Sequence, residues 1–346
     1  MSQSQRLSVA LFVSAVVCSV GFSVGANAAQ GAAAQGARQE DPYAWLMQMH
    51  RAFSELDYDG VFSFYGGDDL ASLRVVHMEL NGVQRERLVH LNGAPREIVR
   101  NGDEVACILM PGDDLLALEG SIPAGPFARA FVRRYDQISD HYGLSFVGED
   151  RVAGRAAMRI AVSPHDSDRF GYRLWLDKQT RLLLRSELID GDGRRLEIFQ
   201  FNQLSLGDDV DARAVEPSGR DGSLVSHLTL AQDQSVAVAK PAMRWGVGWL
   251  PAGFSMAAAD VRRTPSELKP VDTMMYSDGL AAFSVFVEDM PPKGAASMVS
   301  RKGATVAVTQ VVADDQDDPR HLVTLVGELP TPTAQRIAQS IRRTQP

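Results

Sequence analysis

The chain has 346 residues, of which 45% are apolar and 23% are charged, and its formal net charge is −8. This is the composition of an ordinary globular protein, long enough for two domains and with ample apolar material to bury. The acidic balance argues against nucleic acid as a partner, because neutralising phosphates requires a basic surface.

The first 28 residues have the pattern of a secretory signal peptide. A basic residue, Arg6, precedes the apolar run 7–24, and the small residues Ala26-Asn27-Ala28 follow it. The pattern predicts cleavage after Ala28, with a retained membrane anchor as the alternative. Cleavage would remove one positive charge and no negative charge, so the mature chain would be more acidic still. No later segment has 18 consecutive apolar residues, so we expect no other membrane span.

A helix is predicted directly after the signal peptide and its Ala- and Gly-rich tail. Asp41 is a plausible N-cap, and Pro42 suits the first helical position. The apolar residues that recur at helical spacing, and that therefore share one face, are Trp45, Leu46, Met49 and Phe53.

A meander of antiparallel strands is predicted next, between residues 61 and 110. Its runs of Val, Ile and Leu are separated by Asn81-Gly82, Asn92-Gly93 and Asn101-Gly102. Asn-Gly favours tight hairpin turns, because both turn residues need positive φ. The apolar face of the meander is marked by Leu88, Ile98 and Cys107, and the other face carries Arg and Glu.

Residues 123–141 are the one long interruption of the strand pattern. They form either a helix that covers the sheet or a mobile flap over a cavity. Strand patterns resume at residue 144 and continue to residue 204, which gives about ten strands in a domain spanning 40–206. The stretch 207–222, rich in Asp, Gly, Ala and Ser, is predicted to be a linker.

A second, smaller domain is predicted over residues 223–346. It contains strands at 280–288, 305–312 and 321–328 and a final helix. Thr331 is expected to cap this helix, with Pro332 at its first position and Arg342-Arg343 at its negative end.

The chain shows no recognisable catalytic or metal-binding motif. No two of its seven histidines have metal-ligand spacing, and the mature chain would hold only Cys107. His165-Asp166-Ser167 has the composition of a catalytic triad, but three consecutive side chains cannot form the relay, so we interpret it as a strand-end loop. Residues 314–318 lack the glycine and the terminal glutamate of a calcium loop. We therefore expect no enzyme activity and no cofactor.

An open antiparallel sheet must fill its concave side with side chains, helices or ligand. Aromatic residues could line such a lipid cavity, and an equally good interpretation is that they fill a dry core. The candidate lining residues are Phe62, Phe64, Phe127, Phe131, Trp175, Phe199 and Phe201.

Several stretches, taken in order, resemble the RseB/MucB family of periplasmic regulators of the sigma-E (AlgU-type) factor. They are Arg87–Arg100, Val147–Arg155, Arg169–Asp177, Trp249–Phe254 and Tyr276–Glu288. No single stretch is decisive, but their joint order makes the resemblance specific, and it covers residues 41 to about 343.

The resemblance implies a mainly β protein with covering helices. It would consist of an open half-barrel like that of the lipoprotein carriers LolA and LolB, and a smaller α+β C-terminal domain. It also implies residence in the periplasm of a Gram-negative bacterium and binding to the periplasmic part of a transmembrane anti-sigma factor of the RseA/MucA type. That binding would protect the anti-sigma factor from proteolysis until a lipid or lipopolysaccharide-like ligand releases it. A homodimer is possible. A lipid or lipoprotein carrier without a regulatory partner is the alternative, and a secreted hydrolase is a remote third.

Overall fold

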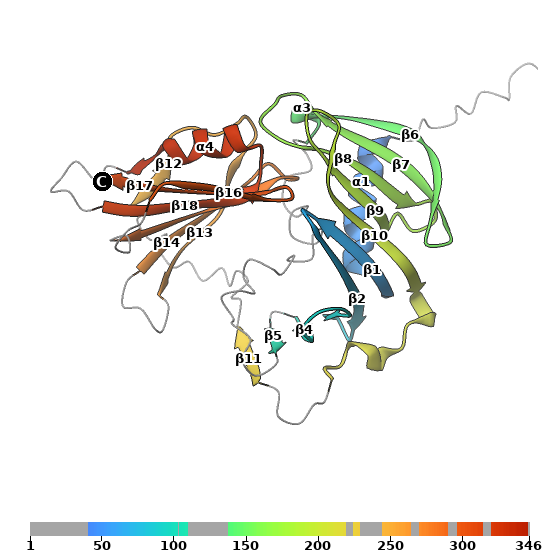
Figure 1. Ribbon diagram of the computed structural model, residues 1–346. Coiled ribbons are helices and arrows are strands. Elements are labelled where there is room, and N and C mark those ends of the chain that lie inside the picture. Colours follow the sequence, from blue (N-terminus) through green and yellow to red (C-terminus); the bar gives the residue numbers. More distant parts are fainter. Residues whose placement is uncertain are drawn as a thin grey trace, which may run out of the picture. The chain divides into compact units, whose positions relative to one another are not determined.

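The protein is described by a computed structural model (Figure 1). The described residues are 41–102, 104–109, 138–218, 224–228, 244–263, 270–289, 296–313 and 320–344. They form a large antiparallel sheet and a smaller one, each with a helix packed on one face, and a two-stranded ribbon. No helix within these ranges combines the length and the apolar character needed to cross a bilayer.

Helix α1 (Pro42–Glu55) begins where the sequence predicts. The Asp41 side chain accepts a hydrogen bond from the backbone N of Tyr43 at 3.0 Å, and Pro42 occupies the first turn. The helix buries Trp45, Leu46, Met49 and Ala52 against the large sheet. The predicted N-cap and apolar face are confirmed, with Phe53 only partly buried.

The large sheet has eleven strands in the order β11-β5-β4-β3-β2-β1-β10-β9-β8-β7-β6. Their bounds are β1 (Tyr58–Gly66), β2 (Asp69–Leu80), β3 (Val83–His90), β4 (Arg96–Asn101), β5 (Glu104–Leu109), β6 (Tyr142–Val152), β7 (Arg155–Pro164), β8 (Gly171–Asp177), β9 (Leu183–Ile189), β10 (Arg195–Leu206) and β11 (Leu224–Leu228). A four-residue helix, α3 (Ile138–His141), precedes β6. Strands β11 and β6 are the two edges, so the sheet is open, and the predicted mainly β fold is confirmed.

Of the three predicted Asn-Gly turns, Asn81-Gly82 has the predicted backbone, whereas Asn92-Gly93 and Asn101-Gly102 have positive φ only at the glycine. Asn81 has a φ of 55° and Gly82 a φ of 77°, the two positive values that a tight hairpin turn requires. The register then places Leu88 opposite Ile98, so these two residues share a face as predicted, and it pairs the backbone of Ile98 with that of Cys107.

The stretch predicted to be a linker contains two 3₁₀ helices, η2 (Gly207–Asp209) and η3 (Ala212–Val215), and β11 follows it in the large sheet. The large sheet therefore continues past residue 206. Glu97 holds this stretch in place, because its Oε1 accepts from the backbone N of Ser218 at 3.0 Å and from Arg87 Nε at 2.7 Å. Burial raises the pKa of Glu97, but the hydrogen bonds from Arg87 and Ser218 outweigh burial, and its net pKa is lowered.

We expect Glu97→Gln to lower the free energy of unfolding by about 1 to 2 kcal/mol, because Arg87 then loses its ion-pair partner in a mostly buried site and keeps only neutral acceptors, among them the carbonyl of Ala214. Urea denaturation measures this loss, and limited proteolysis should show faster cleavage within residues 212–218. Asp211→Asn is the control, since it removes an exposed carboxylate from the same stretch. Equal effects of the two substitutions would mean that Glu97 does not hold the stretch.

The smaller sheet has the order β13-β14-β15-β18-β17-β16. Its strands are β13 (Ser255–Arg263), β14 (Pro270–Ser277), β15 (Ala282–Asp289), β16 (Met298–Lys302), β17 (Thr305–Ala313) and β18 (Arg320–Glu328), and β12 (Trp245–Val247) and β19 (Ile341–Arg343) form the ribbon. The last helix, α4 (Thr331–Gln339), packs Ala334, Ile337 and Ala338 into the core of this sheet.

The predicted ends of the last helix are wrong. Pro330, not Thr331, occupies the N-cap position, because its extended backbone (φ −55°, ψ 136°) leads the chain out of β18. At the other end the Ser340 hydroxyl donates to the carbonyl of Ile337 at 2.7 Å. The helix stops there, and Arg342 and Arg343 belong to strand β19.

Candidate functional site

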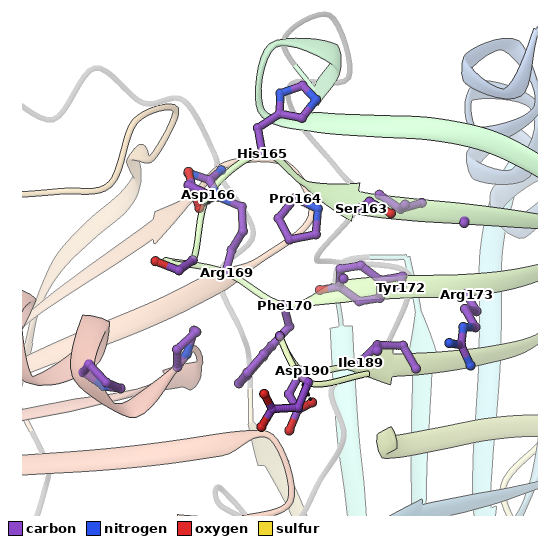
Figure 2. Close-up of a pocket in the computed structure, with 18 of the residues that line it drawn as sticks. Ser163, Pro164, His165, Asp166, Arg169, Phe170, Tyr172, Arg173, Ile189 and Asp190 are labelled. Atoms are coloured by element: carbon purple, nitrogen blue, oxygen red, sulfur yellow. Dashed lines mark hydrogen bonds and ion pairs between the residues drawn. The ribbon is translucent and has the colours of Figure 1, made fainter. Parts of the chain in front are cut away.

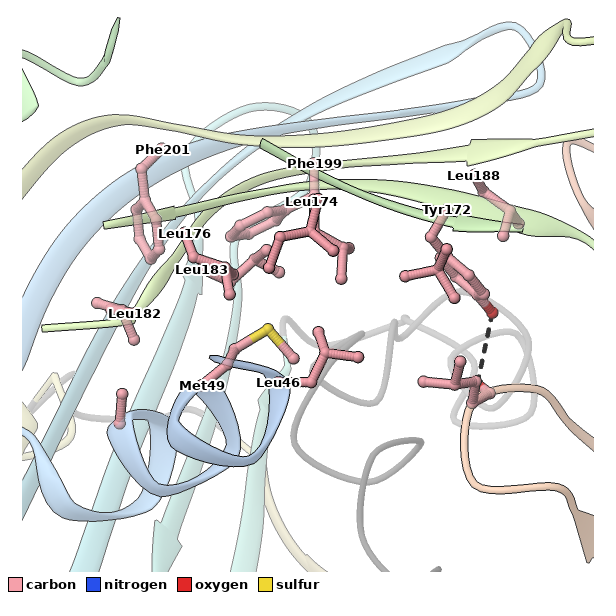
Figure 3. Packing of buried hydrophobic residues seen from close by; sticks show 14 of the residues in the cluster. Leu46, Met49, Tyr172, Leu174, Leu176, Leu182, Leu183, Leu188, Phe199 and Phe201 are labelled. Atoms are coloured by element: carbon pink, nitrogen blue, oxygen red, sulfur yellow. Dashed lines mark hydrogen bonds between the residues drawn. The ribbon is translucent and has the colours of Figure 1, made fainter. Parts of the chain in front are cut away.

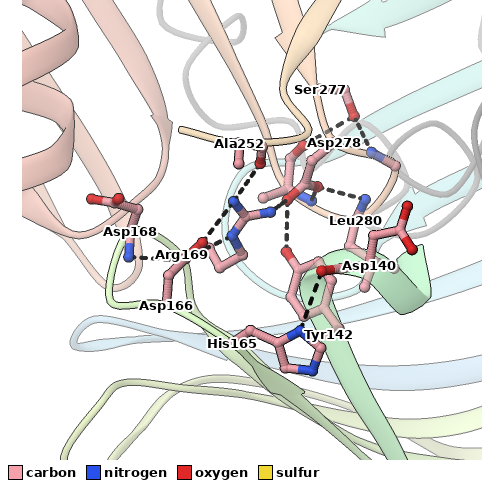
Figure 4. A network of polar contacts seen from close by, with 12 residues as sticks. Asp140, Tyr142, His165, Asp166, Asp168, Arg169, Ala252, Ser277, Asp278 and Leu280 are labelled. Atoms are coloured by element: carbon pink, nitrogen blue, oxygen red, sulfur yellow. Dashed lines mark hydrogen bonds and ion pairs between the residues drawn. The ribbon is translucent and has the colours of Figure 1, made fainter. Parts of the chain in front are cut away.

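The loop between β7 and β8 joins the two sheets. It contains His165-Asp166-Ser167, and its position after the end of β7 at Pro164 confirms the interpretation as a strand-end loop. The Asp166 carboxylate accepts from the backbone N of Asp168 at 3.0 Å and from Arg169. These contacts fix the loop and present the Arg169 side chain toward the smaller sheet (Figure 4).

Arg169 and Asp278 form a buried ion pair between the sheets, and the side chains of both residues are fully buried. Arg169 NH1 lies 2.6 Å from Asp278 Oδ2, which also accepts from the Tyr142 hydroxyl at 2.9 Å. Arg169 NH2 donates to the carbonyl of Ala252 at 2.6 Å. Asp278 Oδ1 accepts from the backbone N of Leu280 at 2.9 Å. Both charged groups therefore have several hydrogen-bond partners in addition to each other.

Ring contacts and protonation states support this network. The Arg169 guanidinium lies 5.4 Å from the ring centre of Tyr142 and 5.3 Å from that of Phe254. Burial, followed by the negative charge of Asp278, raises the pKa of Tyr142 well above its ordinary value. At any physiological pH the phenol therefore stays protonated, and its hydroxyl donates a hydrogen bond to the carboxylate.

The turn between β16 and β17 makes a second contact with the large sheet. A Cβ on Gly303 would lie 2.8 Å from the backbone N of Gly67, so only glycine permits this approach. The next residue, Ala304, donates its backbone N–H to Glu197 Oε1 at 3.0 Å. At the exposed side of the turn, Lys302 Nζ lies 2.5 Å from Asp69 Oδ2.

Two carboxyl groups come together beside this turn. Glu197 belongs to β10 of the large sheet, and Glu328 belongs to β18, where it stands opposite Thr305. Burial and then the charge of Glu197 raise the pKa of Glu328 to about 7. Burial also raises the pKa of Glu197, against the opposing hydrogen bond from Ala304. At neutral pH the pair therefore retains a proton for part of the time.

A pocket of about 840 Å³ opens beside the buried ion pair (Figure 2). Its walls come from the end of β7 with the following loop, the start of β8, the β9–β10 turn and the segment that precedes α4. Its lining includes His165 and the charged residues Arg173, Asp190 and Arg301. Within the described residues, no three His, Cys, Asp or Glu side chains gather as metal ligands.

The predicted lipid-lining residues do not all lie in one cluster. Phe62, Phe199 and Phe201 belong to the core cluster that α1 covers, with ring centres 4.9 Å apart for Phe62 and Phe199 and 5.1 Å apart for Phe199 and Phe201. Figure 3 shows Phe199 and Phe201 with the α1 residues Leu46 and Met49. Phe64 packs at the edge of this cluster and is only partly buried.

The other predicted residues do not join the phenylalanine cluster. Trp175 lies in a separate cluster with Val152, Ala157 and Leu184, because its neighbours Leu174 and Leu176 take the face under α1. Phe127 and Phe131 lie outside the described residues.

Sequence reasoning missed the buried ion pair and the carboxyl pair. Arg169 and Asp278 both lie in stretches that carry the family resemblance, but 109 residues separate them. Glu197 and Glu328 belong to strands of different sheets. Glu328 follows a strongly apolar strand, which was an available signal, whereas Arg169 lies in a polar loop that gave none, and a single sequence does not show which partner either residue meets.

The comparisons with known proteins cover both sheets. The MucB/RseB N-terminal domain matches residues 41–219, and the MucB/RseB C-terminal domain matches residues 239–342. The sigma factor AlgU regulatory protein MucB of Pseudomonas aeruginosa is 36% identical over 87% of this chain and 91% of its own length. The sigma-E factor regulatory protein RseB of Escherichia coli K12 is 30% identical over 86% and 90%.

The solved structures agree with the sequence matches. MucB in complex with MucA(peri) is 32% identical, covers 88% of this chain and all of that chain, and superimposes with a TM-score of 0.69. The Pseudomonas aeruginosa MucA/MucB complex gives a TM-score of 0.71 at 31% identity. With its N-terminal match beginning at residue 41 and its C-terminal match ending at residue 342, the chain belongs to the MucB/RseB family.

Proposed function

We propose that this protein binds the periplasmic part of a transmembrane anti-sigma factor of the MucA/RseA type and protects it from proteolysis, which restrains the envelope-stress sigma factor. The observation that carries the proposal is the match over both domains to a MucB captured with MucA(peri). The matched relatives are named sigma-factor regulatory proteins, and none of them is named as an enzyme. We therefore propose a binding role without catalysis for this protein too.

The proposed location is the periplasm. The anti-sigma segment in the related complex is the one named MucA(peri), and the basic residue, apolar run and small residues within 1–28 of this chain have the pattern of a cleaved export signal. Mass spectrometry of the protein purified from the periplasm tests this proposal. A mature N-terminus at Ala29 is expected, and a retained N-terminus would favour a membrane anchor.

The proposal includes release by a lipid or lipopolysaccharide-like ligand held on the concave face of the large sheet. Phe62, Phe199 and Phe201 fill the core beneath α1, so the part of this face that a lipid could reach is its partly buried edge, where Phe64 lies. Release requires the ligand to bind the free and the partner-bound forms with different affinities.

The test is a calorimetric titration of residues 29–346 with the periplasmic segment of an anti-sigma factor from the same genome, with and without a lipid A-like ligand. Saturable binding that weakens with lipid supports both parts. Binding to the segment that lipid does not weaken supports the regulatory role and contradicts release by lipid. Tight lipid binding without partner binding favours a carrier. Sedimentation of the same samples tests the predicted homodimer.

Two neighbouring residues of β1 lie on opposite faces of the large sheet, one on the concave face and one on the outer face. Phe64 packs against the core cluster, whereas Tyr65 is 41% exposed. We expect Phe64→Ala to weaken lipid binding about tenfold, because it removes apolar contact area from the concave face. Tyr65→Ala should leave lipid binding unchanged. Equal effects would place the lipid elsewhere.

A further inference from the structure

The outer face of strands β7 to β10, opposite the phenylalanine cluster, carries a row of arginines. Arg159 stands opposite Trp175, Trp175 opposite Arg185, and Arg185 opposite Gln200, so the row crosses four strands. Arg173 and Arg195 flank the row on the same face, since both reach the carboxylate of Glu187. We call Arg159, Arg173, Arg185 and Arg195 the arginine ladder.

Glu187 and Trp175, which are both buried, hold the arginine ladder in place. Glu187, whose side chain is only 3% exposed, forms ion pairs with Arg185, with Arg195 at 3.4 Å and with Arg173 at 3.6 Å. The Arg185 guanidinium also lies 4.7 Å from the ring centre of Trp175. The Trp175 indole N–H donates to Asp150 Oδ2 at 2.8 Å, which fixes the ring. The guanidinium groups of Arg173, Arg185 and Arg195 are therefore held by Glu187 before any partner arrives.

The ladder carries more positive charge than its own carboxylates neutralise. Four arginines face two carboxylates, those of Glu187 and Asp150, in a chain whose formal net charge is −8. Arg173 and Arg195 keep 52% and 55% of their side chains exposed. Among the described residues, Arg159 Nε and Arg185 Nε are buried atoms without a hydrogen-bond partner, so the groups open to an outside partner are those of Arg173 and Arg195. The surface therefore offers donors and positive charge to an outside group.

We propose that the arginine ladder is a docking surface for an acidic polypeptide segment, whose Asp or Glu carboxylates take paired N–H contacts from the guanidinium groups. Planar guanidinium forks bind carboxylates in a bidentate manner, and forks at fixed positions lose little freedom on binding. The proposal goes beyond the proposed function, because it assigns a surface by its charge and does not depend on lipid or on a particular partner protein.

A polypeptide fits this surface better than a membrane does. Trp175 is 6% exposed beneath Arg185, so it is not available to enter a lipid interface. The residues of the row that stand beside the arginines are Gln200 and the buried Trp175, so no exposed apolar side chain within the row could insert into a bilayer. A membrane would be held by charge alone, without the geometric match that the forks offer to carboxylates.

The test uses a fluorescent 12-residue peptide of alternating Glu and Ser, with a Gln and Ser peptide for comparison, measured by anisotropy at low and at physiological salt. Arg173→Gln with Arg195→Gln removes two exposed ladder charges and leaves Arg185 on Glu187. The matched control is Arg194→Gln with Arg213→Gln, which removes two exposed arginines outside the ladder. Thermal melts should show that both double variants remain folded.

We expect the ladder variant to bind the Glu peptide at least about tenfold more weakly than the unchanged protein, and the control variant to bind it within about twofold. The Gln peptide should not bind. Equal weakening by the two variants would reduce the effect to overall charge and overturn the proposal. Binding to vesicles of phosphatidylcholine with phosphatidylglycerol, without binding to the Glu peptide, would assign the surface to a membrane instead.

Discussion

Replacing Arg169 with methionine is expected to lower the free energy of unfolding by about 3 to 5 kcal/mol, because it leaves the buried carboxylate of Asp278 without its ion-pair partner. Methionine keeps much of the side-chain length, so the loss reports the charge and hydrogen bonds rather than an empty space. The Tyr142 hydroxyl and two backbone N–H groups still reach Asp278, but they do not replace a full positive charge. Urea denaturation followed by circular dichroism measures the effect.

A surface ion pair of the same chemistry provides the control. Arg74 binds Asp59 through two nitrogens, at 2.9 and 2.6 Å, but its side chain is 40% exposed. Arg74→Met should therefore cost at most about 1 kcal/mol. The double variant Arg169→Met with Asp278→Leu should regain part of the loss, because no unpaired charge then stays buried. Similar costs for Arg169→Met and Arg74→Met would contradict the role given to the buried pair.

The sequence allowed local features to be predicted because their causes are local. Asp41 caps α1 through its own neighbour, and Asn81-Gly82 forms a turn from its own backbone preferences. The apolar alternation in β3 and β4 likewise predicted which residues share a face. These features need no knowledge of distant residues.

Features that depend on distant residues could not be predicted. Strand β11 joins β5 across more than 100 residues, although the sequence pattern predicted that its residues belong to the second domain, and β19 joins β12 across about 100 residues, where the sequence indicated a helix end. The same limit applies to the candidate site. The pocket, the buried ion pair and the carboxyl pair are each made by segments from both sheets. A resemblance to a family predicted the two sheets but not the contacts between them.

The carboxyl pair predicts how stability depends on pH. The pKa of Glu328 is about 7 in the folded protein, against an ordinary value of 4.5. Between these two values the unfolded chain has released the proton that the folded protein still holds, so raising the pH favours unfolding. The contribution is largest below pH 4.5, falls as the pH rises toward 7 and is constant above that. Its full size is at most about 3 kcal/mol.

Glu328→Gln should remove the share of this slope that Glu328 contributes, because the amide keeps the shape of the side chain and has no proton to release, while Glu197, whose pKa burial also raises, keeps its own share. The variant should match the unchanged protein near pH 5 and exceed its free energy of unfolding by about 2 to 3 kcal/mol near pH 8. Glu149→Gln, which changes a carboxylate that is 65% exposed, should follow the unchanged protein at every pH. Urea denaturation from pH 5 to pH 8 measures all three proteins. If the free energies of unfolding of Glu328→Gln and the unchanged protein vary with pH in parallel, Glu328 ionises freely in the folded state. The pair of Glu197 and Glu328 then shares no proton.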